Sequence, residues 1–146
     1  MAVLEQEIFN NVISIGKKAI ESLKLGDIDA FFALSEEAWN QFPKPRNNWN
    51  QEYNFTKMVF NHSMKLERLL KARVWLDRMI ENNNNLHHSD EECLFYEGKY
   101  CFEIREYKTA LKKWKTVVKE AGFRYFEDLD PKYLDFYKNP EKYFSK

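Results

Sequence analysis

The sequence predicts an all-α protein built from antiparallel helical hairpins. Only 4 glycines and 4 prolines interrupt its 146 residues, and aromatic residues reach 16%, a composition that favours long helices packed through large side chains. Apolar residues also recur at steps of three and four, which is the spacing of one buried helix face. Because this length suits one compact unit, we expect a single domain over residues 1–146.

A first hairpin is predicted over residues 3–43. Its first helix runs from about Val3 to Leu25, because Gly26 follows an apolar stripe where a glycine often ends a helix. A second helix begins after Gly26 and ends before Pro43, since proline cannot continue a helix. The residues expected to face inward on it are Ile28, Phe31, Phe32, Leu34, Ala38 and Trp39.

A second hairpin is predicted over residues 48–81, with helices over 48–63 and 66–81. The inward face of its second helix is expected to hold Leu66, Leu69, Leu70, Val74, Leu76, Met79 and Ile80. The four asparagines of 82–85 follow, and such a polar run predicts a loop.

A third hairpin is predicted over residues 89–121. Ser89 and Glu92 have the spacing of a capping box, with Ser89 as N-cap. Gly98 and Ala110 are the small residues expected where the two helices come closest, and Trp114 fills the space one turn further on. A C-terminal segment follows over 123–144, whose helix opens at Asp130-Pro131.

The pattern Leu94-x-x-Glu97-Gly98-x-x-Cys101, followed by Tyr107 and Ala110-x-x-x-Trp114, resembles the tetratricopeptide repeat. Leu94, Glu97 and Cys101 stand where the family has tryptophan, leucine and tyrosine. The resemblance implies three hairpins stacked as a short right-handed superhelix. It also implies that 123–144 caps the exposed end of the array, and that the concave surface binds a partner protein or peptide.

In this family the first helix of each hairpin lines the groove, and the resemblance carries that role to specific positions. They are Ile20 and Lys24, then Asn54, Met58, Asn61 and His62, and then Phe95, Lys99, Phe102 and Glu103. Aromatic and adaptable side chains dominate most interfaces, so Phe95, Phe102 and Met58 are the predicted anchors. The alternative is that these residues pack against Tyr133, Phe136 and Tyr137 of the C-terminal segment.

Composition limits the other classes of partner. The 23 basic and 23 acidic residues balance, so no net field draws the chain to nucleic acid or to an anionic membrane. The first residues lack a secretory signal, and no apolar run approaches ~20 residues. Cys93 and Cys101 would lie roughly 12 Å apart on one helix, beyond the ~7 Å limit of a disulfide. We expect a cytoplasmic protein, and the sequence leaves its oligomeric state open.

Two alternatives to a protein-binding role remain. A hydrolytic or metal-dependent enzyme would use His62 or the His87-His88 region, but the chain lacks paired metal-ligand spacings and nucleophile motifs. RNA would bind the lysine stripe on 108–119, but the acidic neighbours of these lysines favour a solvated face with local ion pairs. We therefore expect no catalytic residues, metal or cofactor. The predicted function is binding of a partner protein, as adaptor, regulator or inhibitor; the small helical form also resembles immunity proteins that block a toxin.

Overall fold

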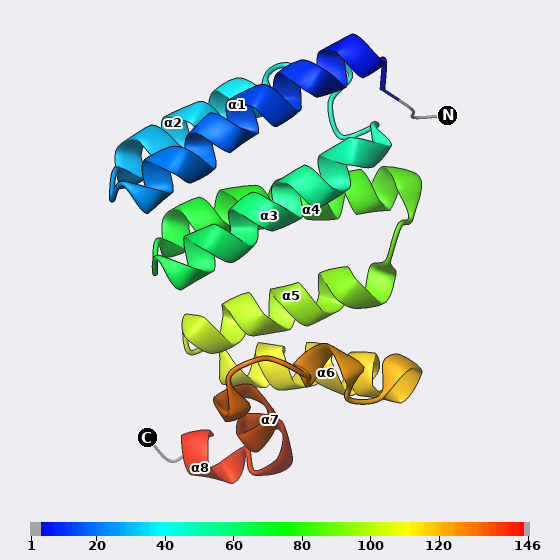
Figure 1. The fold of residues 1–146 in the computed structure, drawn as a ribbon. Helices are drawn as coiled ribbons and strands as arrows, with labels where there is room; N and C mark the ends of the chain where they lie inside the picture. Colours follow the sequence, from blue (N-terminus) through cyan, green and yellow to red (C-terminus); the bar gives the residue numbers. More distant parts are fainter. Residues whose placement is uncertain (1–3, 145–146) are drawn as a thin grey trace.

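The computed structural model describes residues 4–144, which form three antiparallel helical hairpins and a C-terminal helical segment (Figure 1). The hairpins pair α1 (Gln6–Lys24) with α2 (Ile28–Trp39), α3 (Asn50–Lys65) with α4 (Leu69–Leu86), and α5 (Asp90–Glu103) with α6 (Tyr107–Ala121). The segment holds η1 (Arg124–Phe126), α7 (Pro131–Lys138) and α8 (Glu141–Phe144). The predicted all-α class and hairpin pairing are confirmed, although Val3 of the predicted first helix lies outside the described residues.

All three hairpin turns share one backbone geometry. The left-handed residues are Gly26 (φ 81°), Glu67 (φ 57°) and Arg105 (φ 65°). The N–H of the next residue donates back to a carbonyl of the preceding helix, with distances of 2.9 Å for Asp27 to Ser22, 3.0 Å for Arg68 to Ser63 and 2.8 Å for Glu106 to Cys101. This is the Schellman arrangement, which glycine adopts most easily. Only the first turn uses glycine, so the end of α3 and the start of α4 were placed about two residues too early from the sequence.

The buried residues of α4 define its inward face. Ala72 and Trp75 are buried, whereas Leu70 is 87% exposed and Val74 is 41% exposed. The predictions that Leu70 and Val74 face inward were therefore wrong. Ala72, Trp75, Leu76 and Met79 recur at steps of three and four and are all buried, so they form the inward stripe, and Leu70 and Val74 lie outside it.

The asparagine run forms the end of α4, so the predicted loop over 82–85 was also wrong. Asn82 and Asn83 are buried, and their side chains serve as hydrogen-bonding partners for neighbouring segments. Asn82 Nδ2 donates to the carbonyl of Trp49 at 3.1 Å, and Asn85 Nδ2 donates to that of Asn47 at 2.8 Å. Asparagine side-chain amides can hydrogen-bond to backbone groups of a loop that would otherwise be buried without partners. This tertiary role outweighs the weak helix propensity of asparagine.

A continuous core joins the hairpins. Its largest cluster takes residues from α1 to α5: Ala19, Phe31, Phe32, Val59, Phe60, Ala72, Trp75, Leu76 and Tyr100. A second cluster combines α5 and α6 with the C-terminal segment. In Figure 1 the first helices of the hairpins, α1, α3 and α5, follow one another down the stack. The surface along this row is the one that the sequence analysis predicted to bind.

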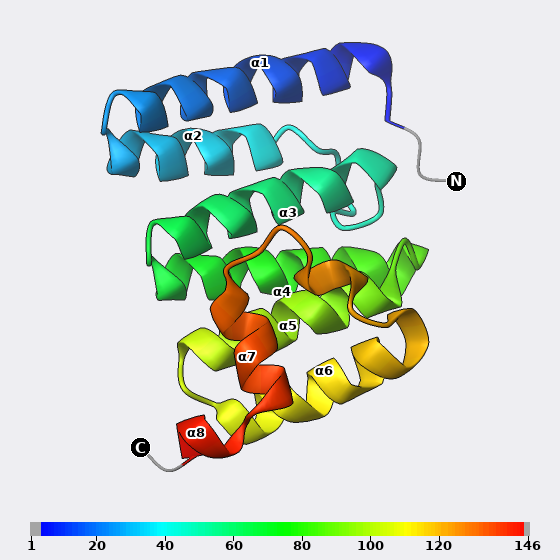
Figure 2. The same ribbon diagram turned by 60° about the horizontal axis from the view of Figure 1, so that its bottom comes forward.

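The C-terminal segment packs on the third hairpin, as Figure 2 shows for α7, which crosses in front of α5 and α6. Phe126, Tyr133 and Phe136 of this segment are buried in the second cluster. Its predicted N-cap is confirmed, because Asp130 Oδ1 accepts a hydrogen bond from the Lys132 N–H at 3.0 Å. The segment is therefore an integral part of the core and covers most of one face of the third hairpin.

The start of α5 fits the prediction in part. Ser89 is the N-cap, and its hydroxyl accepts from the Glu92 N–H at 3.2 Å. The Glu92 side chain does not return to the Ser89 N–H, which instead donates to Asn83 Oδ1 at 2.8 Å. The capping box is incomplete because Glu92 binds residues of the second hairpin.

Candidate partner-binding site

An open, mostly apolar groove of about 510 Å³ lies between α1 and α3. Its lining residues are Phe9, Val12, Ile13, Gly16, Lys17, Ile20, Glu21 and Lys24 from α1, and Gln51, Asn54, Phe55 and Met58 from α3. A volume of this size is within the range of ~300–1,000 Å³ typical of ligand sites. Since no other described element covers it, this groove is a candidate site for a ligand.

The groove combines an apolar floor with a polar rim. Val12 and Gly16 are buried along its floor, and Ile13 is 38% exposed beside them. Lys17, Glu21 and Lys24 are exposed along α1. On α3 the Oε1 atom of Gln51 is buried without a hydrogen-bond partner among the described residues.

The predicted binding residues divide among three places. Lys24, Asn54 and Met58, with Ile20, line the groove between α1 and α3. Asn61, Phe95 and Lys99 line a second cavity, between α3, α5 and residues 124–129. His62, Phe102 and Glu103 lie in neither cavity.

The two predicted aromatic anchors on α5 are covered by the C-terminal segment. Phe95 is 1% exposed and stacks on Trp114 and Tyr125, with ring centroids 5.7 and 5.6 Å away. Phe102 is 7% exposed and packs edge-on against Phe136 at 5.1 Å. Both rings therefore belong to the core, which is the alternative that the sequence analysis left open.

Glu103 is also engaged by the C-terminal segment. Its Oε1 accepts a hydrogen bond from the Tyr133 hydroxyl at 2.7 Å and lies 3.0 Å from Lys132 Nζ. Burial, followed by this hydrogen bond, raises the pKa of Tyr133. The carboxylate anchors α7 to α5.

His62 lies at the interface between the first two hairpins. Its ring packs edge-on against Phe31, with 5.6 Å between centroids. Burial, and secondly the charge of Lys65, lowers the pKa of His62, so its imidazole is neutral at pH 7. A neutral ring on an aromatic side chain fits a packing role.

The other candidate for enzyme chemistry is an exposed histidine pair. His87 Nδ1 lies 3.5 Å from Asp90 Oδ1, and the His88 ring lies 5.1 Å from that of Tyr53. Across residues 4–144, no group of three or more His, Cys, Asp or Glu side chains has a geometry that could hold a metal.

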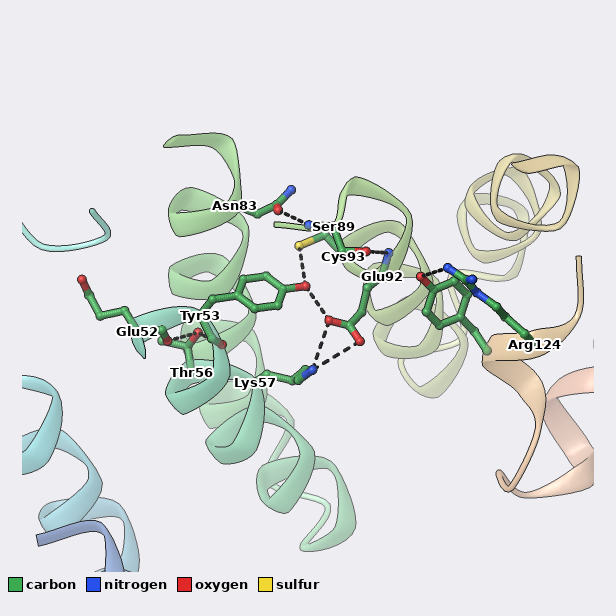
Figure 3. A network of polar contacts seen from close by, with 10 residues as sticks. Glu52, Tyr53, Thr56, Lys57, Asn83, Ser89, Glu92, Cys93 and Arg124 are labelled. Atoms are coloured by element: carbon green, nitrogen blue, oxygen red, sulfur yellow. Dashed lines mark hydrogen bonds and ion pairs between the residues drawn. The ribbon is translucent and has the colours of Figure 1, made fainter. Parts of the chain in front are cut away.

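A polar network joins the second and third hairpins (Figure 3). The Tyr53 hydroxyl donates to Glu92 Oε1 at 2.6 Å, and Lys57 Nζ donates to the same carboxylate at 3.2 Å. Cys93 Sγ lies 3.8 Å from the Tyr53 hydroxyl oxygen. Burial raises the pKa of Tyr53 above its usual range and that of Cys93 to about 12. The network therefore holds helices together, and its thiol is a poor nucleophile.

This environment predicts that both cysteines are unreactive in the folded protein. Cys93 is 4% exposed and Cys101 is 8% exposed, and burial raises the pKa of each. A thiol reagent such as Ellman's reagent, added at pH 8, is expected to label both residues at least ~100-fold more slowly than in denaturant, because attack needs an exposed thiolate. Rapid labelling of either cysteine without denaturant would contradict the buried geometry.

The groove residues that the sequence analysis missed had a recognisable signal. Phe9, Ile13 and Gly16 stand with the predicted Ile20 at spacings of four, three and four residues, so together they form a second stripe beside the buried stripe of α1. A helix buried on only one side needs only one such stripe. The extra stripe marks a face that this part of the chain leaves uncovered.

The α6 helix carries a row of exposed lysines. Four lysines, Lys108, Lys112, Lys115 and Lys119, are exposed on α6, while the neighbouring Lys113 pairs with Glu97 at 3.2 Å.

Within residues 4–144 no helix combines the length and the apolar character needed to cross a membrane. Comparisons with protein-family models, with curated proteins and with solved structures gave no match.

Proposed function

We propose that the protein is a protein-interaction module that binds a segment of a partner protein in the groove between α1 and α3. The observation that carries this proposal is the uncovered apolar face of α1, which continues into Phe55 and Met58 of α3. Monomeric proteins seldom leave a contiguous apolar hollow open unless something binds there. A groove with a polar rim is also typical of peptide and protein recognition.

The seam between α3 and α5 can be compared with this groove, because both lie between the first helices of neighbouring hairpins. Residues 124–129 lie over the equivalent seam between α3 and α5. There the rings of Tyr125 and Phe126 pack on that of Phe95, and their centroids lie 5.6 and 5.0 Å from the Phe95 centroid, respectively. Between α1 and α3 no described segment plays this part. An apolar or aromatic segment of a partner protein would cover the first seam as the chain's own segment covers the second.

We also propose the finer architecture of a short, right-handed, tetratricopeptide-like superhelix. The shared turn geometry supports it. So do Ala72 and Ala110, which are both 0% exposed and stand at the same position after their turns. Phe31 takes this place in the first hairpin, so the first repeat departs from the pattern. Such a module would serve as an adaptor, a regulator or an inhibitor that blocks a toxin. Its two buried cysteines are free thiols, which is consistent with the reducing environment of the cytoplasm.

The test is to fill the groove without harming the fold. Gly16 lies on the groove floor, and a Cβ atom there would have Phe55 Cε1 as its nearest neighbour at 3.7 Å, an ordinary contact. Gly16→Leu is therefore expected to keep or raise the melting temperature, because leucine is a better helix former than glycine. We expect it to weaken binding of the partner at least ~10-fold, since its side chain occupies the space of an apolar anchor.

The partner for this measurement is identified by cross-linking. A photo-reactive amino acid at Ile13 is expected to capture one protein in cells, which mass spectrometry identifies and which is then purified for titration. The same amino acid at Lys112, an exposed residue on α6, serves as the control. If cross-linking at Lys112 captures the same protein equally well, or if Gly16→Leu binds it with unchanged affinity, the groove is not the binding site.

A further inference from the structure

The groove between α1 and α3 also indicates which kind of partner segment it binds. Its lining residues on α1 recur at helical spacing from Phe9 to Lys24, and those on α3 do so from Gln51 to Met58. At ~1.5 Å per residue, these two faces extend about 22 and 10 Å along their helices. Both walls are therefore helix surfaces. Their backbone groups already bond within α1 and α3, so only side chains can contact a ligand.

An extended segment would be poorly accommodated in this groove. Its backbone N–H and C=O groups would need partners, and burying them without partners costs free energy. Residues 4–144 contain no β-strand whose edge could supply partners, and the groove floor at Val12 and Gly16 is apolar. Gln51 and Asn54 are the uncharged polar side chains of the lining, too few to serve a whole segment. A helix avoids this cost, because its backbone groups bond to one another.

The chain's own segment at the seam between α3 and α5 has this property. In residues 124–129, backbone N–H groups donate to carbonyls three residues earlier, from Phe126 to Phe123 at 3.0 Å and from Glu127 to Arg124 at 3.3 Å. These bonds form the helical turn η1, and Phe126 is buried in the core. The segment therefore places an aromatic side chain in the seam while its backbone bonds within itself.

The α1 edge of the groove carries a charge pattern. Lys17, Glu21 and Lys24 follow one another at steps of four and three residues, which places them along one edge. All three are exposed, and none forms an ion pair within residues 4–144. The lining residues on α3 carry no charge. An acidic, a basic and an acidic side chain, spaced in the same way along a partner helix, would complement this edge.

We propose that the groove binds an amphipathic α-helix of the partner protein, about four turns long. Its apolar face lies on the groove floor, and one edge carries an acidic, a basic and an acidic residue opposite Lys17, Glu21 and Lys24. This inference rests on the proposed function, because it names the type of segment that occupies the same groove.

The experiment selects binders from two matched libraries of displayed 18-residue peptides, with the whole chain as the target. Both libraries randomise the same positions, spaced as one helix face. The remaining positions are alanine and glutamine in the first library, which favour a helix, and include prolines in the second, which prevent one. Each selected peptide is then titrated against the native protein and against Gly16→Leu.

We expect the peptides that lose at least ~10-fold in affinity for Gly16→Leu to come from the helix-forming library. If the proline library yields such peptides equally well, the helical inference is overturned and the groove remains a binding site. If neither library yields a peptide sensitive to Gly16→Leu, the groove is not a binding site and both proposals fail.

Proline at a central alanine position of a selected peptide tests the helix directly. Binding should weaken at least ~30-fold, because proline breaks a helix interior. Glutamine at the same position is the matched control and should bind normally. Equal binding by the proline and glutamine peptides would contradict a helical ligand.

Lys17→Glu combined with Lys24→Glu tests the charge pattern. We expect the affinity for the selected peptides to fall about fivefold or more at low salt, and the difference from the native protein to shrink as salt is added. Lys112→Glu combined with Lys119→Glu makes the same change of charge on α6 and should bind nearly as the native protein does. Equal losses in the two double variants would refute the predicted pattern.

Sedimentation of the native chain distinguishes a partner helix from a second copy of this protein. We expect a monomer. A dimer that Gly16→Leu dissociates would assign the groove to a second copy and overturn the proposal.

Discussion

Gly98→Ala is expected to lower the free energy of unfolding by about 3 kcal/mol, the upper end of what overpacking usually costs. A Cβ atom at position 98 would collide with Trp114, 2.5 Å from Cδ1 and 2.9 Å from Cε2, and closer still to Nε1. Trp114 cannot easily withdraw. Its ring is 0% exposed, and Nε1 donates a hydrogen bond to the Phe95 carbonyl at 2.9 Å. One methyl group would therefore disturb the contact between α5, α6 and the C-terminal segment.

Gly16→Ala is the matched control for this substitution. It is also a glycine within a helix and buried, but a Cβ atom there would meet Phe55 Cε1 at 3.7 Å, which needs no rearrangement. We expect it to stabilise the protein by up to about 1 kcal/mol, because alanine is the better helix former. Urea denaturation measures both changes, and each kcal/mol corresponds to roughly 2–4 °C in melting temperature at about this chain length. Equal effects at the two positions would contradict the close contact at Gly98.

Glu52→Ala is the second substitution with a large expected effect, a loss of about 3 kcal/mol of unfolding free energy, because it leaves buried backbone donors without an acceptor. The Glu52 carboxylate is 0% exposed. It accepts the Asn47 N–H at 2.8 Å and the Trp49 N–H at 3.3 Å. Without it, these donors in the connection between the first two hairpins lose their acceptor. Glu52→Gln, which retains one carboxamide oxygen, is expected to lose less.

The effect of Glu52→Ala should also depend on pH. Burial raises the pKa of Glu52 above its ordinary value of 4.5, and the backbone hydrogen bonds oppose this only in part. The folded state therefore binds the proton more tightly than the unfolded state, so the contribution of Glu52 to stability is greatest below pH 4.5 and falls as pH rises through the folded pKa. The stability gap between the native protein and Glu52→Ala should narrow between pH 4 and pH 7 in urea titrations. A gap that widens over this range would mean that the backbone hydrogen bonds outweigh burial.

The fold follows largely from local sequence signals. Helical spacing of apolar residues identified each hairpin, and Ser89 and Asp130 act as N-caps where their side chains predicted it. Gly98 lies directly against Trp114, which agrees with the prediction that a small residue is needed at this position of the contact between α5 and α6. Such signals depend on residues within one or two turns of each other, so they can be interpreted without knowing what lies across the core.

Sequence patterns say less about the candidate site, because binding depends on which helix faces the folded chain leaves uncovered. Lys24, Asn54 and Met58 line one groove, whereas Phe95 and Phe102 are buried beneath the C-terminal segment. An aromatic side chain at helical spacing has the same pattern whether a partner or the chain itself covers it.

By itself, then, the sequence determined the helices, their pairing and the small residue that brings α5 and α6 together, since these follow from backbone preferences and periodicity. The tertiary structure decided that Asn82 and Asn83 end a helix instead of forming a loop, because their amides meet distant backbone and side-chain groups. It also decided that the C-terminal segment covers the seam between α3 and α5 and leaves the one between α1 and α3 open. Contacts between segments far apart in the chain determine burial, and those contacts exist only once the hairpins have packed.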